Sequence, residues 1–298
     1  MRWLKSISFG AICALATTII LAMVAILIGD VVWYGRERLT FEFITARPRM
    51  GITEGGVFPA IVGTVFLVVL MTIAVVPLGV ATAVYLNEYA RRDSKLVLAV
   101  RLAIQNLAGV PAIVFGLFGC GFFILFIGRG IDVAGFGGRL VFGQPCILWA
   151  SLTMALLTLP TVVVATEEAL RAVPQVYREA ACALGATRWQ VVSRIVLPQS
   201  VGGILTGAIL AVSRGTGEVA PIMFTGVAYL LPYLPDKLTS QFMHLGYHIY
   251  VLATQSPNVE ATRPLLYSSV LLLLILTFAL NLTGILIRSR IRRRLRTG

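Results

Sequence analysis

Charged residues are scarce in this sequence. Of its 298 residues, 13% are Asp, Glu, Lys or Arg, whereas 58% are hydrophobic. Soluble domains carry about 25% charged residues, so a chain with half that share has too few to cover a water-facing surface. The composition excludes a soluble globular protein and indicates an integral membrane protein.

The side chains that most enzymes and metal sites need are also few. There are two histidines and four cysteines without C-x-x-C spacing, which excludes a disulfide framework and a zinc-ribbon site. His244 and His248 have the i, i+4 spacing of a metal-binding pair. No carboxylate or cysteine lies close in sequence to supply the third and fourth ligands, so we interpret the pair as an ordinary polar face.

Motifs for nucleotide binding and for catalysis are missing as well. The sequence contains no G-x-x-x-x-G-K-[ST] loop, so the chain cannot hold ATP in the usual phosphate-binding loop. It has no Ser/His/Asp arrangement and no metal-ligand cluster. We therefore expect no catalytic residue, no metal and no cofactor in this chain, and any energy for its work must come from a partner.

Long apolar runs are what the sequence does have. Six of them can cross about 30 Å of hydrocarbon, which takes ~20 helical residues. The first is too long for a signal peptide and lacks a cleavage site, so we expect it to be retained. The fold class is thus an all-α integral membrane protein with six transmembrane helices. The runs lie at 7–29, 59–86, 103–128, 146–167, 200–226 and 265–287.

The third run is rich in small residues. Pro111 precedes Gly116, Gly119 and Gly121 in it, and small residues let membrane helices approach closely. The pattern predicts an irregular, closely packed helix, and both a packing role and a functional role stay open.

Basic residues predict the orientation. The N-terminus, the loops at 87–101 and 171–199 and the C-terminal tail together hold 16 Lys and Arg, against 8 on the other side. Because loops rich in Lys and Arg stay in the cytoplasm, we expect both termini and the 171–199 loop to be cytoplasmic. The arginine-rich tail at 288–298 suggests nucleic acid binding at first sight. Directly after an apolar run, it is better interpreted as a stop-transfer and anionic-lipid contact.

The 171–199 loop carries a helix-turn-helix pattern. Pro174 can begin a helix, Gly185 can end it in the left-handed conformation, and Thr187 can cap a second short helix that ends near Leu197 and Pro198. Ala180 and Ala181 let another surface approach closely, and Arg178, Glu179 and Arg188 offer charges to it. The loop is predicted to dock into a partner's groove; the alternative is a helix pair lying on lipid head groups.

Arg214 and Glu218 lie inside the fifth apolar run. Each costs ~2.5–3.5 kcal/mol at the centre of a lipid-facing helix, so we expect both to face away from lipid, paired at i, i+4. One interpretation is a structural ion pair. In the other, which we favour, Arg214 lines a water-filled path and contacts a passing oxyanion, with Glu218 weakening that contact so that the anion can leave. Ser213 and Thr216 are included in the predicted path.

The spacing E-A-A-x3-G-x9-I-x-L-P resembles the cytoplasmic coupling loop of bacterial ABC importer permeases, with every fixed position present. The residues that match it are Glu179, Ala180, Ala181, Gly185, Ile195, Leu197 and Pro198. Within that family, Ser213-Arg214-x-x-Gly217-Glu218-x-Ala220-Pro221 and the segment 106–111 resemble the PstA-type phosphate permeases. Val219 departs from the usual Thr, so the resemblance implies no hydroxyl contact there.

The resemblance implies more than the residues alone. It implies the type I ABC importer permease fold with cytoplasmic coupling helices, in the bacterial inner membrane. It also implies phosphate passage by Arg214 and Glu218, a PstC-type sister permease, two copies of a PstB-type ATPase that bind ATP, and an external phosphate-binding protein. We divide the chain into an N-terminal helix and outer loop (1–58), a permease core (59–287) and a basic tail (288–298).

Other functions stay open on the residues themselves. A permease for sulfate or molybdate would use the same arginine geometry, because these oxyanions share the tetrahedral shape. An ion-coupled secondary transporter would show inverted repeats and several buried acids. A membrane-embedded enzyme would need a nucleophile or metal cluster among the spans.

Overall fold

The computed structural model describes residues 2–49, 54–91, 94–256 and 259–297. These residues form helices almost throughout, together with one short antiparallel pair of strands, β1 (Pro48–Arg49) and β2 (Glu54–Gly55). Six helical segments are long and apolar enough to cross a membrane, which confirms the predicted fold class. They are Gly10–Gly35, Phe58–Tyr89, Ala112–Gly135, Ile147–Arg171, Arg188–Gly217 and Thr262–Arg294.

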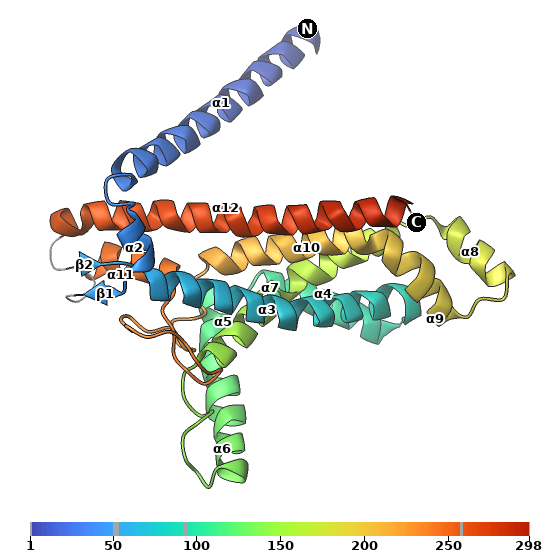
Figure 1. Ribbon diagram of the computed structural model, residues 1–298. Helices are drawn as coiled ribbons and strands as arrows, with labels where there is room; N and C mark the ends of the chain where they lie inside the picture. Colours follow the sequence, from blue (N-terminus) through green and yellow to red (C-terminus); the bar gives the residue numbers. More distant parts are fainter. Residues whose placement is uncertain (1, 50–53, 92–93, 257–258, 298) are drawn as a thin grey trace.

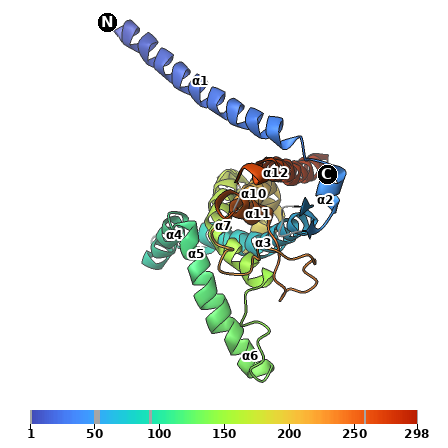
Figure 2. The same ribbon diagram turned by 90° about the vertical axis from the view of Figure 1, so that its left-hand side faces the viewer.

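Four long helices form the body of the molecule (Figure 1 and Figure 2). They are α3 (Phe58–Val84), α7 (Ile147–Arg171), α10 (Leu197–Gly217) and α12 (Val259–Thr297). Helix α7 is the most enclosed of the four. In its most apolar stretch of 18 residues 67% of the residues are buried, against 33% in the span that contains α3 and 6% in the one in α12. Side chains of α3 and α7 such as Leu67, Met71 and Met154 fill the core between them.

Two segments leave this body, as Figures 1 and 2 show. Helix α1 (Arg2–Gly35) stands apart, with none of its most apolar 18-residue stretch buried. It is held at its end by a 2.7 Å hydrogen bond from Ser268 Oγ to the Gly35 carbonyl. The second is a continuous helical arm that projects from the side of the body. It consists of α5 (Ala112–Phe118), the π-helical η3 (Gly119–Gly128) and α6 (Arg129–Gly135).

The short elements gather at the two ends of the body. Helices α8 (Gln175–Ala183) and α9 (Arg188–Val191) lie at one end, near the C-terminus of α12, and we call this the loop end (Figure 1). The strands, α2 (Phe41–Thr45) and α11 (Leu245–Thr254) lie at the opposite end.

Several predicted boundaries were wrong. The third span begins at Ala112, not 103, because Gly109 and the extended Pro111 separate it from an independent helix, α4 (Lys95–Ala108). The predicted helix end at Leu197 and Pro198 does not exist. Helix α9 continues through the π-helical η4 (Val192–Val196) into α10, since Pro198 sits at the first turn of α10, where its missing N–H is tolerated.

Close contact between α7 and α10 holds the body together. Lipid tails are as apolar as these side chains, so membrane helices associate mainly through tight packing. A Cβ at Gly203 would collide with Ala169 Cβ, whereas no described atom lies within 4 Å of a Cβ at the neighbouring Gly202.

We expect Gly203→Ala to destabilise the protein and Gly202→Ala not to. Both changes favour the helix equally, so their difference isolates packing, where overfilling costs ~1–3 kcal/mol. Thermal unfolding of the purified protein in detergent should show an apparent Tm several degrees lower for Gly203→Ala than for its control. Equal Tm values would contradict the packing described here.

Candidate functional site

The 171–199 loop forms the predicted pair of helices. Helix α8 follows Pro174, and Gly185 ends it with a φ of +83°, a conformation that other residues rarely adopt. Thr187 caps α9 through a reciprocal pair of hydrogen bonds. Its Oγ1 accepts from the Gln190 N–H at 3.3 Å, and Gln190 Oε1 accepts from the Thr187 N–H at 2.8 Å. The predicted turn at Gly185 and cap at Thr187 are confirmed.

The loop presents apolar side chains outward. Leu184 is 90% exposed, Val176 69% and Trp189 64%, and Glu179 and Ala180 are exposed beside them. An exposed tip with large apolar groups is typical of a surface that another protein or the membrane covers.

Other motif residues face inward instead. Ala181 is buried against Val191 and Val196, and Ile195 and Leu197 pack against the same cluster. The expectation that both alanines meet a partner was therefore wrong for Ala181, because one face of α8 must pack on the helix that follows it.

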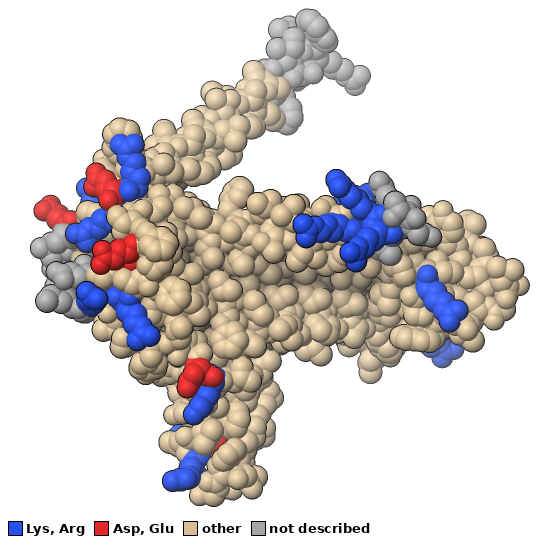
Figure 3. All heavy atoms as spheres, in the orientation of Figure 1, with Lys and Arg blue, Asp and Glu red and all other residues tan. Residues whose placement is uncertain are grey.

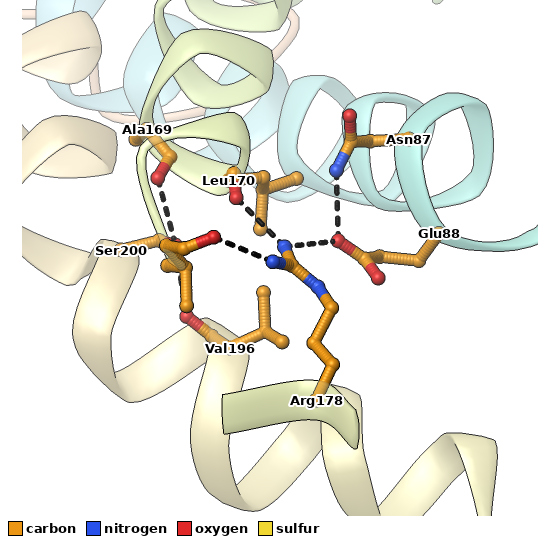
Figure 4. Close-up of polar contacts among 8 residues, drawn as sticks. Asn87, Glu88, Ala169, Leu170, Arg178, Val196 and Ser200 are labelled. Atoms are coloured by element: carbon orange, nitrogen blue, oxygen red, sulfur yellow. Dashed lines mark hydrogen bonds and ion pairs between the residues drawn. The ribbon is translucent and has the colours of Figure 1, made fainter. Parts of the chain in front are cut away.

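Arg178 is also turned into the chain, which corrects its assignment to an outside contact (Figure 4). Its guanidinium pairs with Glu88 Oε1 at 2.9 Å and donates to the carbonyls of Leu170 at 2.8 Å and Val173 at 2.6 Å. The Glu88 side chain is only 10% exposed and that of Arg178 14%, and Asn87 donates a further hydrogen bond to Glu88 at 2.7 Å. Arg178 thus fastens α8 to the ends of both α7 and η2 (Tyr85–Tyr89).

A second charged cluster joins α4 to the same region. Glu167 Oε2 lies 2.9 Å from Arg101 Nη1 and 3.4 Å from Arg171 Nη2, and Arg101 also donates to the Leu86 carbonyl at 2.8 Å. Sequence analysis missed Glu88, Arg101 and Glu167, because Arg101–Glu167 and Arg178–Glu88 join residues 66 and 90 positions apart. The only local signal was the i, i+4 spacing of Glu167 and Arg171.

The predicted Arg214–Glu218 pair exists. Arg214 Nε lies 3.3 Å from Glu218 Oε1, and the side chains are 36% and 29% exposed. Helix α10 ends at Gly217, however, and Glu218 has an extended backbone with φ −82° and ψ 124°. The expectation that both residues lie within the fifth span was therefore wrong for Glu218, because Gly215 and Gly217 weaken the helix and Pro221 cannot continue it.

The two hydroxyl residues of the predicted path lie differently. Ser213 is partly exposed beside Arg214. Thr216 is completely buried and donates to the Val212 carbonyl at 2.8 Å. The structure therefore brings Arg214 and Glu218 together, leaves Ser213 partly exposed as the residue before Arg214 on α10, and turns Thr216 toward the interior.

An irregular segment after Glu218 is enclosed by the arm, α7 and α11. A Cβ at Gly116 would lie 3.0 Å from the Ala220 and Pro221 carbonyl oxygens, and the Cys146 N–H donates to the Thr225 carbonyl at 3.0 Å. The predicted close packing of the third span is confirmed at Gly116, against this segment, and at Gly119, against Thr153 and Thr225. It was wrong for Gly121, because no described atom lies within 4 Å of a Cβ there. Non-helical backbone at membrane depth is tolerated only where protein encloses it or it lines a water-filled cavity.

The two histidines belong to α11, the helix whose Gly246 lies against Val219. His244 caps α11 by accepting the Gly246 N–H on Nδ1 at 3.1 Å, and the side chains are 1% and 3% exposed. The interpretation of a polar face was wrong, because α11 packs between α3 and α12. Burial lowers the pKa of His244 to about 3 and that of His248 to about 4.

These histidines predict acid sensitivity. Both stay neutral in the folded protein while unfolded chains take up protons near pH 6.5, so their contribution to stability is complete above that pH. It is lost as the pH falls toward the folded pKa values of about 4 and 3. At pH 5 the loss is about 2 kcal/mol per histidine.

The apparent Tm should therefore drop between pH 7 and pH 5. His244→Asn, which keeps a capping side chain, combined with His248→Leu, should flatten this part of the profile. An unchanged slope in the double variant would show that other groups cause the acid sensitivity.

Six membrane-crossing helices, a broken span with a charged pair and a protruding apolar loop define a membrane-embedded transport subunit. The sequence model for binding-protein-dependent transport system inner membrane components matches residues 75–297. The chain belongs to this family and is therefore a multi-pass inner-membrane transport component, not an enzyme.

Several sequence relatives of this chain are ABC transporter permeases. The phosphate transport system permease protein PstA of Mycobacterium leprae is 36% identical over 240 residues, which cover 80% of this chain and 73% of that protein. PstA of Yersinia pestis is 33% identical over 240 residues, 80% of this chain and 75% of that protein. The probable ABC transporter permease protein YqgI of Bacillus subtilis is 32% identical over 211 residues, with coverages of 71% and 67%.

Solved structures agree on the fold. A bacterial ABC transporter involved in the import of the acidic polysaccharide alginate aligns with a TM-score of 0.65 at 18% identity, covering 97% of this chain and 99% of that chain. The MetNI methionine ABC transporter aligns with a TM-score of 0.55 at 18% identity, with coverages of 79% and 94%. The chain has the type I ABC importer permease fold.

Proposed function

We propose that this chain is the permease subunit of an ATP-driven importer of inorganic phosphate. The observation that carries the proposal is the partly exposed Arg214–Glu218 pair at the end of a broken membrane helix. A guanidinium keeps its charge when it is desolvated, and its fork of donors fits a tetrahedral oxyanion. The PstA names of the relatives favour phosphate over sulfate or molybdate.

The exposed side of the Arg214–Glu218 pair must face something other than lipid. Facing lipid, each charge would cost ~2.5–3.5 kcal/mol, yet about a third of each side chain is open in the single chain. A sister permease of the PstC type would close this side and leave a water-filled path between the two subunits. Glu218 then competes with the anion for Arg214 and allows it to leave toward the cytoplasm.

Energy enters at the loop end. The exposed tip formed by Val176, Leu184 and Trp189, together with Glu179, docks into a PstB-type ATPase, one copy on each permease. That partner binds and hydrolyses ATP. Closure of the ATPase pair moves α8, and the Arg178 network passes the movement to the ends of α7 and η2, which switches the path between its two openings.

The charge distribution gives the orientation in this proposal. The loop end and both termini are cytoplasmic, because 16 of the Lys and Arg residues lie on that side against 8 on the other. An external phosphate-binding protein delivers its anion at the opposite end, where α11 and the strands lie.

Uptake of radiolabelled phosphate tests the proposal. In cells that depend on this permease, phosphate should accumulate in an ATP-dependent manner, and excess sulfate or molybdate should not compete. Competition by sulfate or molybdate would assign the chain to another oxyanion. Uptake that persists without the ATPase but collapses with the ion gradient would indicate a secondary transporter.

A further inference from the structure

A groove of about 670 Å³ opens at the loop end, between α8, the start of α10 and the end of α12. It is separate from the Arg214 surface at the other end of α10. Its lining residues are Tyr177, Pro198, Gln199, Val201, Gly202, Arg288 and Arg292.

The polar part of this lining consists of hydrogen-bond donors. Arg288 and Arg292 are one helical turn apart on α12, so their guanidinium groups share a face. Tyr177 brings a phenol from α8 and Gln199 an amide from α10, and no lining residue is acidic. In the described part of the chain neither arginine forms an ion pair. Two guanidinium groups with two neutral donors match the oxygens of a phosphate group.

The charge around the groove has one sign on the visible face. Figure 3 shows basic side chains gathered at this end of α12 with no acidic side chain beside them. Their field attracts anions to this face of the molecule.

The remaining lining is apolar and lies beside the point where the apolar sequence of α12 ends. Pro198, Val201 and Gly202 form this part, while the apolar sequence of α12 runs up to Ile287 and gives way to arginine at Arg288. A ligand with a phosphate head and a hydrocarbon chain satisfies both parts at once, because arginines at such a boundary reach the head groups.

We propose that the groove binds a phosphate group and that its occupant is the head group of an anionic phospholipid. Such a lipid would contact α8 through Tyr177 and α12 through Arg288 and Arg292, so it would tie the protruding loop to the last span. The site is independent of the transported solute; only its influence on coupling rests on the proposed function.

Binding can be measured without transport. Titration of the purified protein in detergent with short-chain phosphatidylglycerol should give saturable binding, and short-chain phosphatidylcholine should bind at least about tenfold more weakly. Arg288→Gln with Arg292→Gln should weaken phosphatidylglycerol binding at least tenfold, and Tyr177→Phe a few-fold. The matched control, Arg194→Gln with Arg290→Gln, removes two exposed arginines outside the groove and should change binding less than threefold.

Three results would overturn the proposal. Equal weakening in the groove variant and in its control would show general attraction to a basic surface. Absence of saturable binding in the wild-type protein, with its unfolding transition intact, would remove the site. Equally tight binding of inorganic phosphate, lost in the groove variant, would assign the groove to free phosphate and exclude the lipid.

Discussion

Phosphate uptake should fall at least tenfold when Arg178 is replaced by Gln, while the assembled complex continues to hydrolyse ATP. The guanidinium holds α8 to Glu88 and to two carbonyls at the end of α7. Removing one partner of an enclosed ion pair leaves the other without compensation and costs ~3–5 kcal/mol. A loss of ~1.4 kcal/mol in coupling is already tenfold in rate.

The charge exchange Arg178→Glu with Glu88→Arg provides the specific test. It restores the ion pair but not the two carbonyl bonds, so we expect uptake to recover in part relative to Arg178→Glu alone. Arg171→Gln is the matched control, because Arg171 is 58% exposed and Glu167 keeps Arg101 as a partner; exposed pairs contribute little. Normal uptake in Arg178→Gln would show that the network does not serve coupling.

Arg214→Gln should remove phosphate uptake almost completely with normal amounts of protein in the membrane. A neutral amide cannot compensate the negative charge of an oxyanion for the hydration that it loses on leaving water. Glu218→Gln should behave differently, because it frees Arg214 to hold the anion: we expect a lower KM together with a lower maximal rate.

Comparison of these two variants separates the two roles of the pair. If Arg214 only supports the structure through Glu218, both single variants and the double variant should be equally impaired, with unchanged KM. If Arg214 contacts the anion, Glu218→Gln retains measurable uptake and Arg214→Gln does not. Leu210→Ala, one turn earlier on the same exposed side of α10, is the control for altered packing.

Local signals in the sequence predicted local structure. Apolar runs gave the six spans, because the bilayer dictates their length. The turn at Gly185 and the cap at Thr187 followed from backbone preferences that act within a few residues. The i, i+4 spacing of Arg214 and Glu218 correctly predicted their pairing.

Features decided by distant contacts could not be predicted in this way. Arg178 looked like a surface charge, since nothing near it in sequence indicates Glu88, 90 positions earlier. Ala180 and Ala181 are equivalent in the sequence pattern. Only the packing of α8 on α9 makes Ala181 buried and leaves Ala180 exposed. Pro198 suggested a helix end, yet a proline in the first turn of α10 leaves the helix intact.

The enclosed segment after Glu218 also has a consequence for biosynthesis. Three parts of the chain contact this segment: Gly116 of the third span, Cys146 at the start of the fourth, and Gly246 of α11. Gly246 lies against Val219. A nascent chain that has inserted its first five spans still lacks α11. The backbone that fixes Glu218 therefore reaches its final position only after ribosomal synthesis has passed residue 254, so the charge pair is among the last parts of the molecule to mature.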